Sequence, residues 1–226
     1  MEIPDPLSIL RQIPGIHAAW VERIPGIDVN ADREEVMRRL RPAHQSAVAR
    51  LAAGRPHTWW RAEQVHGADV AIVPGADQIP YADGLQVVPG VDGLVSNHDG
   101  SLLSIYVADC GAIWLADRRT RAIGLLHSGK KGTEHNIVQR AVDTMAEHFG
   151  SDPRDLIAIL SPCIRPPDYE VDFAAEIARQ SDRAGIGNFI DSGQNTTCDP
   201  SRYYSYRKES GKTGRMMALL YRSPAS

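Results

Sequence analysis

A series of short apolar runs between residues 57 and 127 limits this chain to a fold with a strand-rich core. The runs read HTWWRAEQV, ADVAIVP, VDGLVS, SLLSIYVAD, AIWLAD and RAIGLLH. Aliphatic and β-branched residues dominate them, and turn-forming residues separate them, which is typical of strands. The turn at residues 97–100 (NHDG) and the polar residues 118–120 predict that the last four runs form two strand pairs.

Two longer segments show helical spacing of their apolar residues. Residues 32–53 place Asp32 as a candidate N-cap, and Pro42 is expected to break or kink that helix. Residues 132–150 put their apolar side chains on one helical face, with Thr133 as the expected N-cap.

The remaining apolar segments complete the expected set of elements. Residues 173–185 predict a helix, and residues 155–161 and 215–222 predict strands. Many strands with a few interspersed helices favour a mixed α/β (α+β) layer architecture over a regular βαβ repeat. Without repeats or long linkers, one domain over residues 1–226 is the simplest expectation.

Composition excludes several classes of function. The chain carries 25 basic and 28 acidic residues, a net charge of −3, so it lacks the strong positive field expected of a nucleic-acid or membrane binder. Its N-terminus does not resemble a secretory leader, and its apolar runs are far shorter than a membrane span. Three widely spaced cysteines fit a reducing compartment, so we expect a cytoplasmic protein.

Two histidines and one cysteine lie where an apolar run meets a small-residue turn: His66, Cys110 and His127. Two imidazoles and one thiolate suit zinc, with copper as the alternative ion. Three protein ligands leave a fourth position open, as in catalytic zinc sites. Taken singly, each residue is also explained as a turn residue or a small buried side chain. The same three residues would equally serve a cysteine hydrolase, with Cys110 as nucleophile and a histidine as base.

The segment from His127 to Thr133 is a glycine-rich loop that leads into the expected helix. Backbone N–H groups at such a position favour an anion, and Lys130 and Lys131 add positive charge. A phosphate co-substrate would fit there, although two solvated lysines are the plainer interpretation. The loop is not a P-loop, because Lys131 stands where Ser or Thr must hold magnesium.

The segments QVHG, ADC, HSGKKG, SPCIRPPDYEV and SYRKESGKTGR, in this order over roughly residues 59–222, resemble the YfiH-type family. That family is also called the laccase-domain, multicopper polyphenol oxidase or purine nucleoside phosphorylase family. The resemblance implies a four-layer αββα sandwich. It also implies that His66, Cys110 and His127 are the metal-binding and catalytic residues of an enzyme that phosphorolyses adenosine, inosine and methylthioadenosine, with some adenosine deamination.

Further substrate contacts follow mainly from this resemblance. Tyr206 is expected to stack on a purine and Arg207 to bind phosphate, unless Arg207 instead pairs with an acid such as Glu170. Asp109, next to Cys110, is a candidate to orient a ligand histidine or to cap a turn. The expected partners are a purine nucleoside and phosphate.

Two segments depart from the family pattern. HSGKKG replaces the usual H-A-G-W-R-G, and residues 21–26 match the family's T-R-x-G-G-V-S stretch poorly. Both segments would line the pocket, so the departures bear on substrate choice rather than on His66, Cys110 and His127.

Three alternatives to a nucleoside phosphorylase remain open. Some family members are described as peptidoglycan editing factors, which would make this chain a precursor amidase using cysteine hydrolase chemistry. Others are described as copper-dependent polyphenol oxidases, but a true multicopper site needs on the order of ten imidazoles. The chain has eight histidines, so only a single copper in the three-residue site fits that reading. A non-catalytic binding module would use the same pocket.

Overall fold

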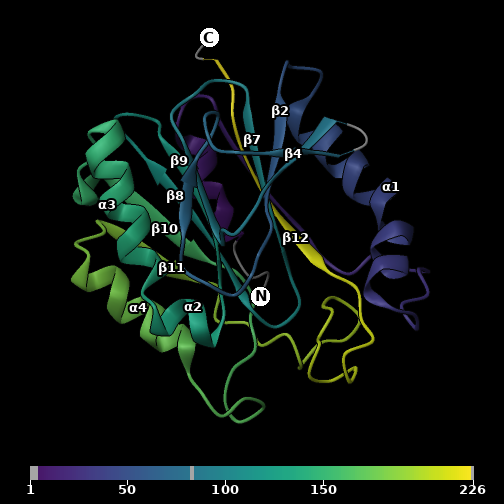
Figure 1. Cartoon of the computed structure of the whole chain (residues 1–226). Coiled ribbons are helices and arrows are strands. Elements are labelled where there is room, and N and C mark those ends of the chain that lie inside the picture. Colours follow the sequence, from purple (N-terminus) through teal and green to yellow (C-terminus); the bar gives the residue numbers. More distant parts are fainter. Residues whose placement is uncertain (1–4, 82–83, 225–226) are drawn as a thin grey trace.

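The computed structural model describes residues 5–81 and 84–224, and within them the strands form two six-stranded sheets (Figure 1). Sheet A has the order β1-β12-β7-β2-β5-β4 and sheet B the order β11-β10-β8-β9-β6-β3. The strands of sheet A are β1 (Ile16–Val21), β12 (Met216–Arg222), β7 (Ser101–Val107), β2 (Thr58–Ala62), β5 (Leu85–Val88) and β4 (Ile79–Pro80). The strands of sheet B are β11 (Asn188–Asp191), β10 (Leu156–Leu160), β8 (Gly111–Asp117), β9 (Ile123–Ser128), β6 (Gly93–Ser96) and β3 (Val70–Ile72).

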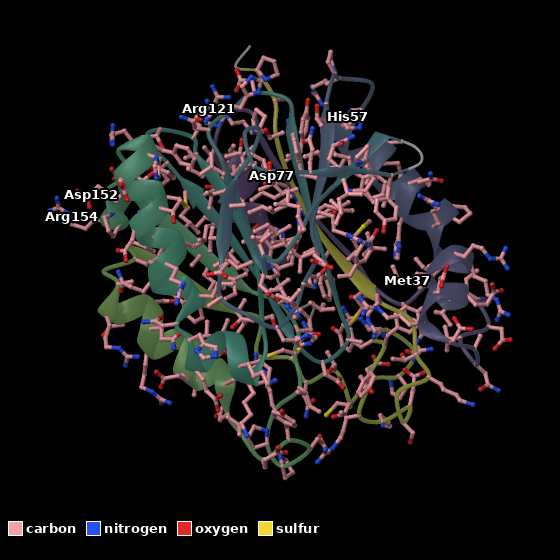
Figure 2. The ribbon with its side chains drawn as sticks, in the orientation of Figure 1. Met37, His57, Asp77, Arg121, Asp152 and Arg154 are labelled. Carbon is pink, nitrogen blue, oxygen red and sulfur yellow. The ribbon has the colours of Figure 1, made fainter. Side chains whose placement is uncertain are left out.

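The two sheets pack face to face, and helices cover their outer faces. In β12, Ala218 and Leu220 belong to the core between the sheets, whereas Leu219 faces α1 (Arg33–Ala52). In β10, Ile159 faces sheet A, and its neighbours face α3 (Ile137–Phe149) and α4 (Phe173–Arg183). This alternation produces four layers in the order helix, sheet, sheet, helix. The expected αββα sandwich is therefore confirmed, with side chains filling the space between its layers (Figure 2).

One predicted strand pair is confirmed and the other is wrong. Strands β8 and β9 form an antiparallel hairpin across residues 118–120. Strand β6 belongs to sheet B, however, and β7 to sheet A, so the turn at 97–100 carries the chain from one sheet to the other. Both strands are buried on both faces, and the period of their apolar residues therefore could not show which sheet each one joins.

The helices also differ in detail from their predicted forms. Residues 132–150 form two helices, α2 (Lys130–Glu134) and α3, separated at Asn136. Asn136 has a left-handed backbone with φ of 55° and caps α3 by accepting from the Gln139 N–H. The hydroxyl of Thr133 instead lies 2.9 Å from that of Ser128, so Thr133 is not the N-cap. Helix α1 runs through Pro42 without a break.

The remaining predicted elements are confirmed, and several others were not predicted. Strands β10 and β12 and helix α4 lie where the sequence indicates. The 3-10 helices η1 (Pro6–Gln12) and η3 (Pro153–Asp155) and strands β1, β4, β5 and β11 lie outside the predicted segments. Within the described part of the chain, no helix is both long enough and apolar enough to cross a membrane.

Two connections from sheet A to sheet B converge at one end of the sandwich. The chain passes from β2 to β3 through residues 63–69, and from β7 to β8 through residues 108–110. Strand β9 ends at this same place, because Ser128 pairs with Gly111 at the start of β8. The topology therefore brings together three segments that are distant in sequence.

Candidate active site

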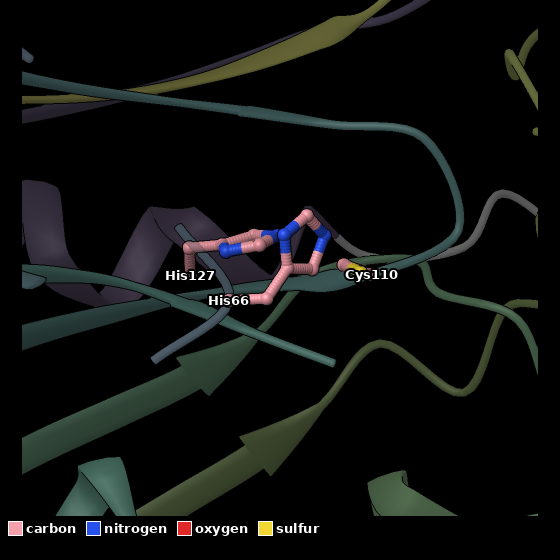
Figure 3. A group of neighbouring side chains, drawn as sticks. All are labelled: His66, Cys110 and His127. Carbon is pink, nitrogen blue, oxygen red and sulfur yellow. The ribbon is translucent and has the colours of Figure 1, made fainter. Parts of the chain in front are cut away.

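The three predicted ligand residues meet where these segments converge. One nitrogen each from His66 and His127 and the sulfur of Cys110 all lie within 4.8 Å of one another. The two imidazole rings are edge to face, with centroids 4.9 Å apart, and Figure 3 shows the two rings with Cys110 beside them. His127 is only 4% exposed, whereas His66 faces solvent, so the group is reachable from outside.

Asp92, which the sequence analysis did not single out, organises this group. Its carboxylate is fully buried and accepts a hydrogen bond from Nδ1 of His127 at 2.7 Å. The same carboxylate accepts from the backbone N–H groups of Val65, His66 and Gly67, at 3.2, 3.0 and 2.7 Å. One side chain thus fixes the ring of His127 and the turn that carries His66. The sequence signal for it was an acid directly before the buried strand β6.

Close packing sets the positions of the other two side chains. A Cβ on Gly129 would lie 2.6 Å from Sγ of Cys110, so only glycine allows the loop after β9 to pass the thiol. His66 has a left-handed φ of 62°, which its bond to Asp92 helps to hold. The amide of Gln64 bonds both the N–H and the C=O of Tyr106, and thereby ties this turn to β7.

The charges of the group are coupled. Burial alone would raise the pKa of Cys110, but the charge of His127 and hydrogen bonds from both histidines outweigh it and lower that pKa to about 6. Burial alone would lower the pKa of His127, but Cys110 and Asp92 raise it to about 9. In the metal-free chain the pair is therefore a thiolate beside an imidazolium at neutral pH.

The donor set fits a single zinc-type ion. Because Asp92 occupies Nδ1 of His127, Nε2 is the nitrogen left free to bind a metal. Zinc bonds of about 2.0 Å to nitrogen and 2.3 Å to sulfur place tetrahedral ligand atoms roughly 3.5 Å apart. Separations of up to 4.8 Å then require the side chains to close by about 1 Å. All three residues line one pocket, so an ion that they held would be accessible from it.

That pocket has a volume of about 1060 Å³ and contains all four predicted substrate-binding residues: Lys130, Lys131, Tyr206 and Arg207. Arg33 and Arg215 also line it. We call these six residues the rim of the pocket. We call His66, Cys110 and His127, together with Asp92 behind them, its floor. The floor and the predicted binding residues therefore share one cavity.

The contacts of Arg207 bear on two predictions from the sequence, the availability of Arg207 for a ligand and the role of Asp109. Its guanidinium lies 3.7 Å from Glu170, and both side chains are exposed, so this ion pair is weak and leaves Arg207 able to bind a ligand. Asp109 accepts from the backbone N–H of Arg207 at 2.7 Å and from the hydroxyl of Thr196 at 2.7 Å. Asp109 therefore anchors the loop of Arg207, and Asp92 takes the histidine-orienting role for which Asp109 was a candidate.

Lys130 and Lys131 are the first two residues of helix α2 and do not lie in a loop before a helix. Helix α2 has only five residues, so the dipole of a long helix does not act at these lysines. Both lysines are exposed, and within the described part of the chain no hydrogen bond or ion pair of their side chains is found. Their contribution to the pocket is charge.

Comparison with known proteins identifies relatives over most of the chain. A family model described as "Multi-copper polyphenol oxidoreductase laccase" matches residues 25–184 and 171–223. A protein of Deinococcus radiodurans named purine nucleoside phosphorylase is 34% identical over 76% of this chain and 74% of its own length. Purine nucleoside phosphorylase YlmD of Geobacillus stearothermophilus is 29% identical over 87% of this chain and 82% of its own.

Solved structures share the fold. The hypothetical protein YfiH of Bacillus licheniformis superimposes with a TM-score of 0.73 at 22% identity, covering 91% of this chain and 92% of its own. The structure of YlmD from Geobacillus stearothermophilus gives a TM-score of 0.71 at 24% identity, covering 94% and 93%.

Proposed function

The chain belongs to the family described as multi-copper polyphenol oxidoreductase laccase, and we propose that it is a zinc-dependent purine nucleoside phosphorylase. The observation that carries the proposal is the convergence of His66, Cys110 and His127 at the floor of a pocket with a cationic rim. Relatives named purine nucleoside phosphorylase at about 30% identity support the reaction class. The proposed substrates are adenosine, inosine and methylthioadenosine.

In this proposal the rim binds the substrates and the floor supplies the chemistry. Lys130, Lys131 and Arg207 hold inorganic phosphate, and Tyr206, whose side chain is 56% exposed, stacks on the purine. An oxygen of phosphate forms a bond to C1′ of the ribose, and the C1′–N9 bond breaks. N9 keeps the electron pair and takes a proton from solution or from phosphate.

Asp92 acts on this reaction through His127. It binds Nδ1 of the ring, so that Nε2 is the nitrogen left free to bind a metal. A bound zinc ion would act as a Lewis acid and acidify a water molecule, which accounts for a side activity that deaminates adenosine. The three free cysteines fit a reducing compartment, so the proposed location is the cytoplasm.

Metal analysis combined with product identification tests this function. The full chain is purified without chelators, its zinc and copper contents are measured, and adenosine is supplied with phosphate. About one zinc per chain, with adenine and ribose 1-phosphate as products, is the expected result. Turnover unaffected by removal of the metal, or a copper content near four per chain, would contradict the proposal.

A cysteine hydrolase acting on a peptidoglycan precursor is the second candidate. It is favoured by the contacts of His127, whose ring lies between the thiol of Cys110 and the carboxylate of Asp92. A nucleophile, a base and an orienting acid are therefore in contact. Its activity would survive chelation and would be lost on alkylation of Cys110. Among the residues that the structure describes, His66, Cys110 and His127 form the one group able to hold a metal, which argues against a multicopper laccase.

A further inference from the structure

The rim carries more positive charge than inorganic phosphate requires. Five cationic side chains line the pocket, together with a single carboxylate, that of Asp109. Both oxygens of that carboxylate already accept hydrogen bonds, from Thr196 and from the backbone of Arg207. The cations gather here although the chain as a whole has a net charge of −3. The five cations are Arg33, Lys130, Lys131, Arg207 and Arg215.

Four of these five cations, all except Arg207, fall into two groups on opposite sides of the floor. Lys130 and Lys131 follow β9 of sheet B, whereas Arg33 begins α1 and Arg215 precedes β12, both on the sheet A side. The floor lies between them, because His66 and Cys110 are in connections that cross from sheet A to sheet B. Figure 1 shows the same separation, with α2 and α1 on opposite sides of the sandwich.

Neither cation of the sheet A group forms a direct ion pair with an acid among the residues that the structure describes. Arg215 donates to the carbonyl oxygens of Thr213 and Gly214 at 3.2 and 2.8 Å, which fixes its guanidinium without cancelling its charge. Within the described residues, no acid pairs with Arg33. Burial, and next the nearby charge of Arg33, lower the pKa of Arg215, and the opposing effects of Cys110, Tyr206 and Asp109 do not cancel them, so the two cations repel each other. A dianion between them would remove that repulsion.

We propose that the preferred substrate is a purine nucleoside 5′-monophosphate, whose own phosphate binds Arg33 and Arg215 while Lys130 and Lys131 hold the attacking phosphate. This inference rests on the proposed phosphorolysis. A cavity of about 1060 Å³ is at the large end of ligand pockets and holds a nucleotide together with phosphate. Phosphate attacks C1′, the C1′–N9 bond breaks and N9 is protonated, so AMP yields adenine and ribose 1,5-bisphosphate.

Substrate preference and one pair of variants test this inference. The zinc-loaded full chain is assayed for kcat/KM with AMP and with adenosine at saturating phosphate, beside Arg33→Gln and the matched control Arg38→Gln. Arg38 lies on the same helix but outside the pocket. We expect AMP to be preferred by about tenfold or more, as a charged contact implies, and Arg33→Gln to lower that preference about tenfold. Arg38→Gln should keep the preference.

The possible outcomes distinguish a failure of the nucleotide inference from a failure of the phosphorylase proposal. Turnover of adenosine that equals or exceeds that of AMP overturns the nucleotide inference and leaves the phosphorylase in place. So does a preference that Arg33→Gln does not change. Should neither substrate react, the phosphorylase proposal fails, and calorimetric binding then decides about the phosphate subsite. AMP binding tighter than adenosine in the native chain and in Arg38→Gln, but not in Arg33→Gln, supports the subsite, and equal binding of the two in the native chain overturns it.

Discussion

At the floor of the pocket, Asp92 and His127 are almost completely buried, and the carboxylate of Asp92 accepts four hydrogen bonds. At the rim, Lys130 and Lys131 are exposed, and Arg207 makes one loose ion pair with Glu170. Asp92 and His127 are thus fixed by the fold before any ligand binds, whereas Lys130, Lys131 and Arg207 of the rim are left free to contact one. Buried charge-assisted contacts are strong and sensitive to geometry, while exposed charges are weak and screened by salt.

This difference between floor and rim indicates that the two regions have different roles. Residues of the floor should control whether the reaction occurs at all, and residues of the rim should control which anion is bound and how tightly. The family departure HSGKKG falls on this boundary: His127 belongs to the floor, and three residues later the rim begins. Variants of the two regions should therefore differ in both size and kind of effect.

Removal of the thiol should have the largest effect. Cys110→Ala takes away a proposed metal ligand, so we expect kcat/KM for the nucleoside to fall about 1000-fold or more and bound zinc to be lost. Cys163→Ala is the matched control, because this thiol is buried in the apolar cluster between sheet B and its helices. It should retain both the kcat/KM and the bound zinc. Phosphorolysis that survives in Cys110→Ala would show that the floor is not the reaction centre.

Loss of the orienting acid should have the next largest effect. Asp92→Asn keeps the shape of the side chain but removes the charge that His127 and three backbone N–H groups share. We expect zinc affinity to fall about 10- to 100-fold, as for other carboxylates behind a ligand histidine, with a fall of about 2 kcal/mol in the free energy of unfolding. Zinc titration and urea unfolding measure these.

The control for Asp92 is Asp69→Asn, because the carboxylate of Asp69 is on the surface and pairs with Arg140. It should change neither quantity beyond about 0.5 kcal/mol. Equal zinc affinity in Asp92→Asn and the native chain would mean that His127 needs no orienting partner, and the contrast between floor and rim would lose its physical basis.

The ionisation of Cys110 gives a third and smaller effect, in the metal-free chain. Its pKa of about 6 means that thiolate forms as the pH rises through 6. Alkylation by iodoacetamide in a Cys198→Ser background should therefore increase from pH 5 to 7 and then level off. At pH 7 the thiolate fraction should be about 30 times that of an ordinary thiol with a pKa near 8.5, but the lower nucleophilicity of the thiolate reduces the gain in rate to about twofold to threefold. A midpoint near 8.5 would contradict the thiolate–imidazolium pair, and Cys110→Ala identifies the labelled residue.

The sequence predicted the parts of the site that sit on recognisable strand ends. His66, Cys110 and His127 each follow an apolar run, and the structure places them together. Asp92 was overlooked because Asp-Gly before a strand is an ordinary turn signal, and its partners lie 25 to 35 residues away in the sequence. Only the crossing from β2 to β3 brings Gly67 and His66 to its carboxylate.

The same limit explains which parts of the fold were predicted. The β8–β9 hairpin depends on three local residues and was predicted correctly. The partners of β6 and β7 depend on which sheet each strand enters, and a run that is buried on both faces carries no sign of that choice. Local patterns predicted the longer elements, whereas contacts between residues distant in sequence determine the sheet that each strand joins and the position of Asp92 behind His127.

The smallest effect should come from variants of the rim. Unlike the effects expected at the floor, it should change the KM for phosphate and leave kcat almost unchanged. Lys130→Gln combined with Lys131→Gln removes two exposed charges, so we expect the KM for phosphate to rise about threefold to tenfold while kcat stays within about twofold. Because exposed charges are screened, the native KM should rise with salt and approach that of the variant near 1 M. Lys212→Gln, an exposed lysine outside the pocket, is the matched control. A fall in kcat as large as that of Asp92→Asn would place these lysines in the chemistry itself, and the division between floor and rim would have to be abandoned.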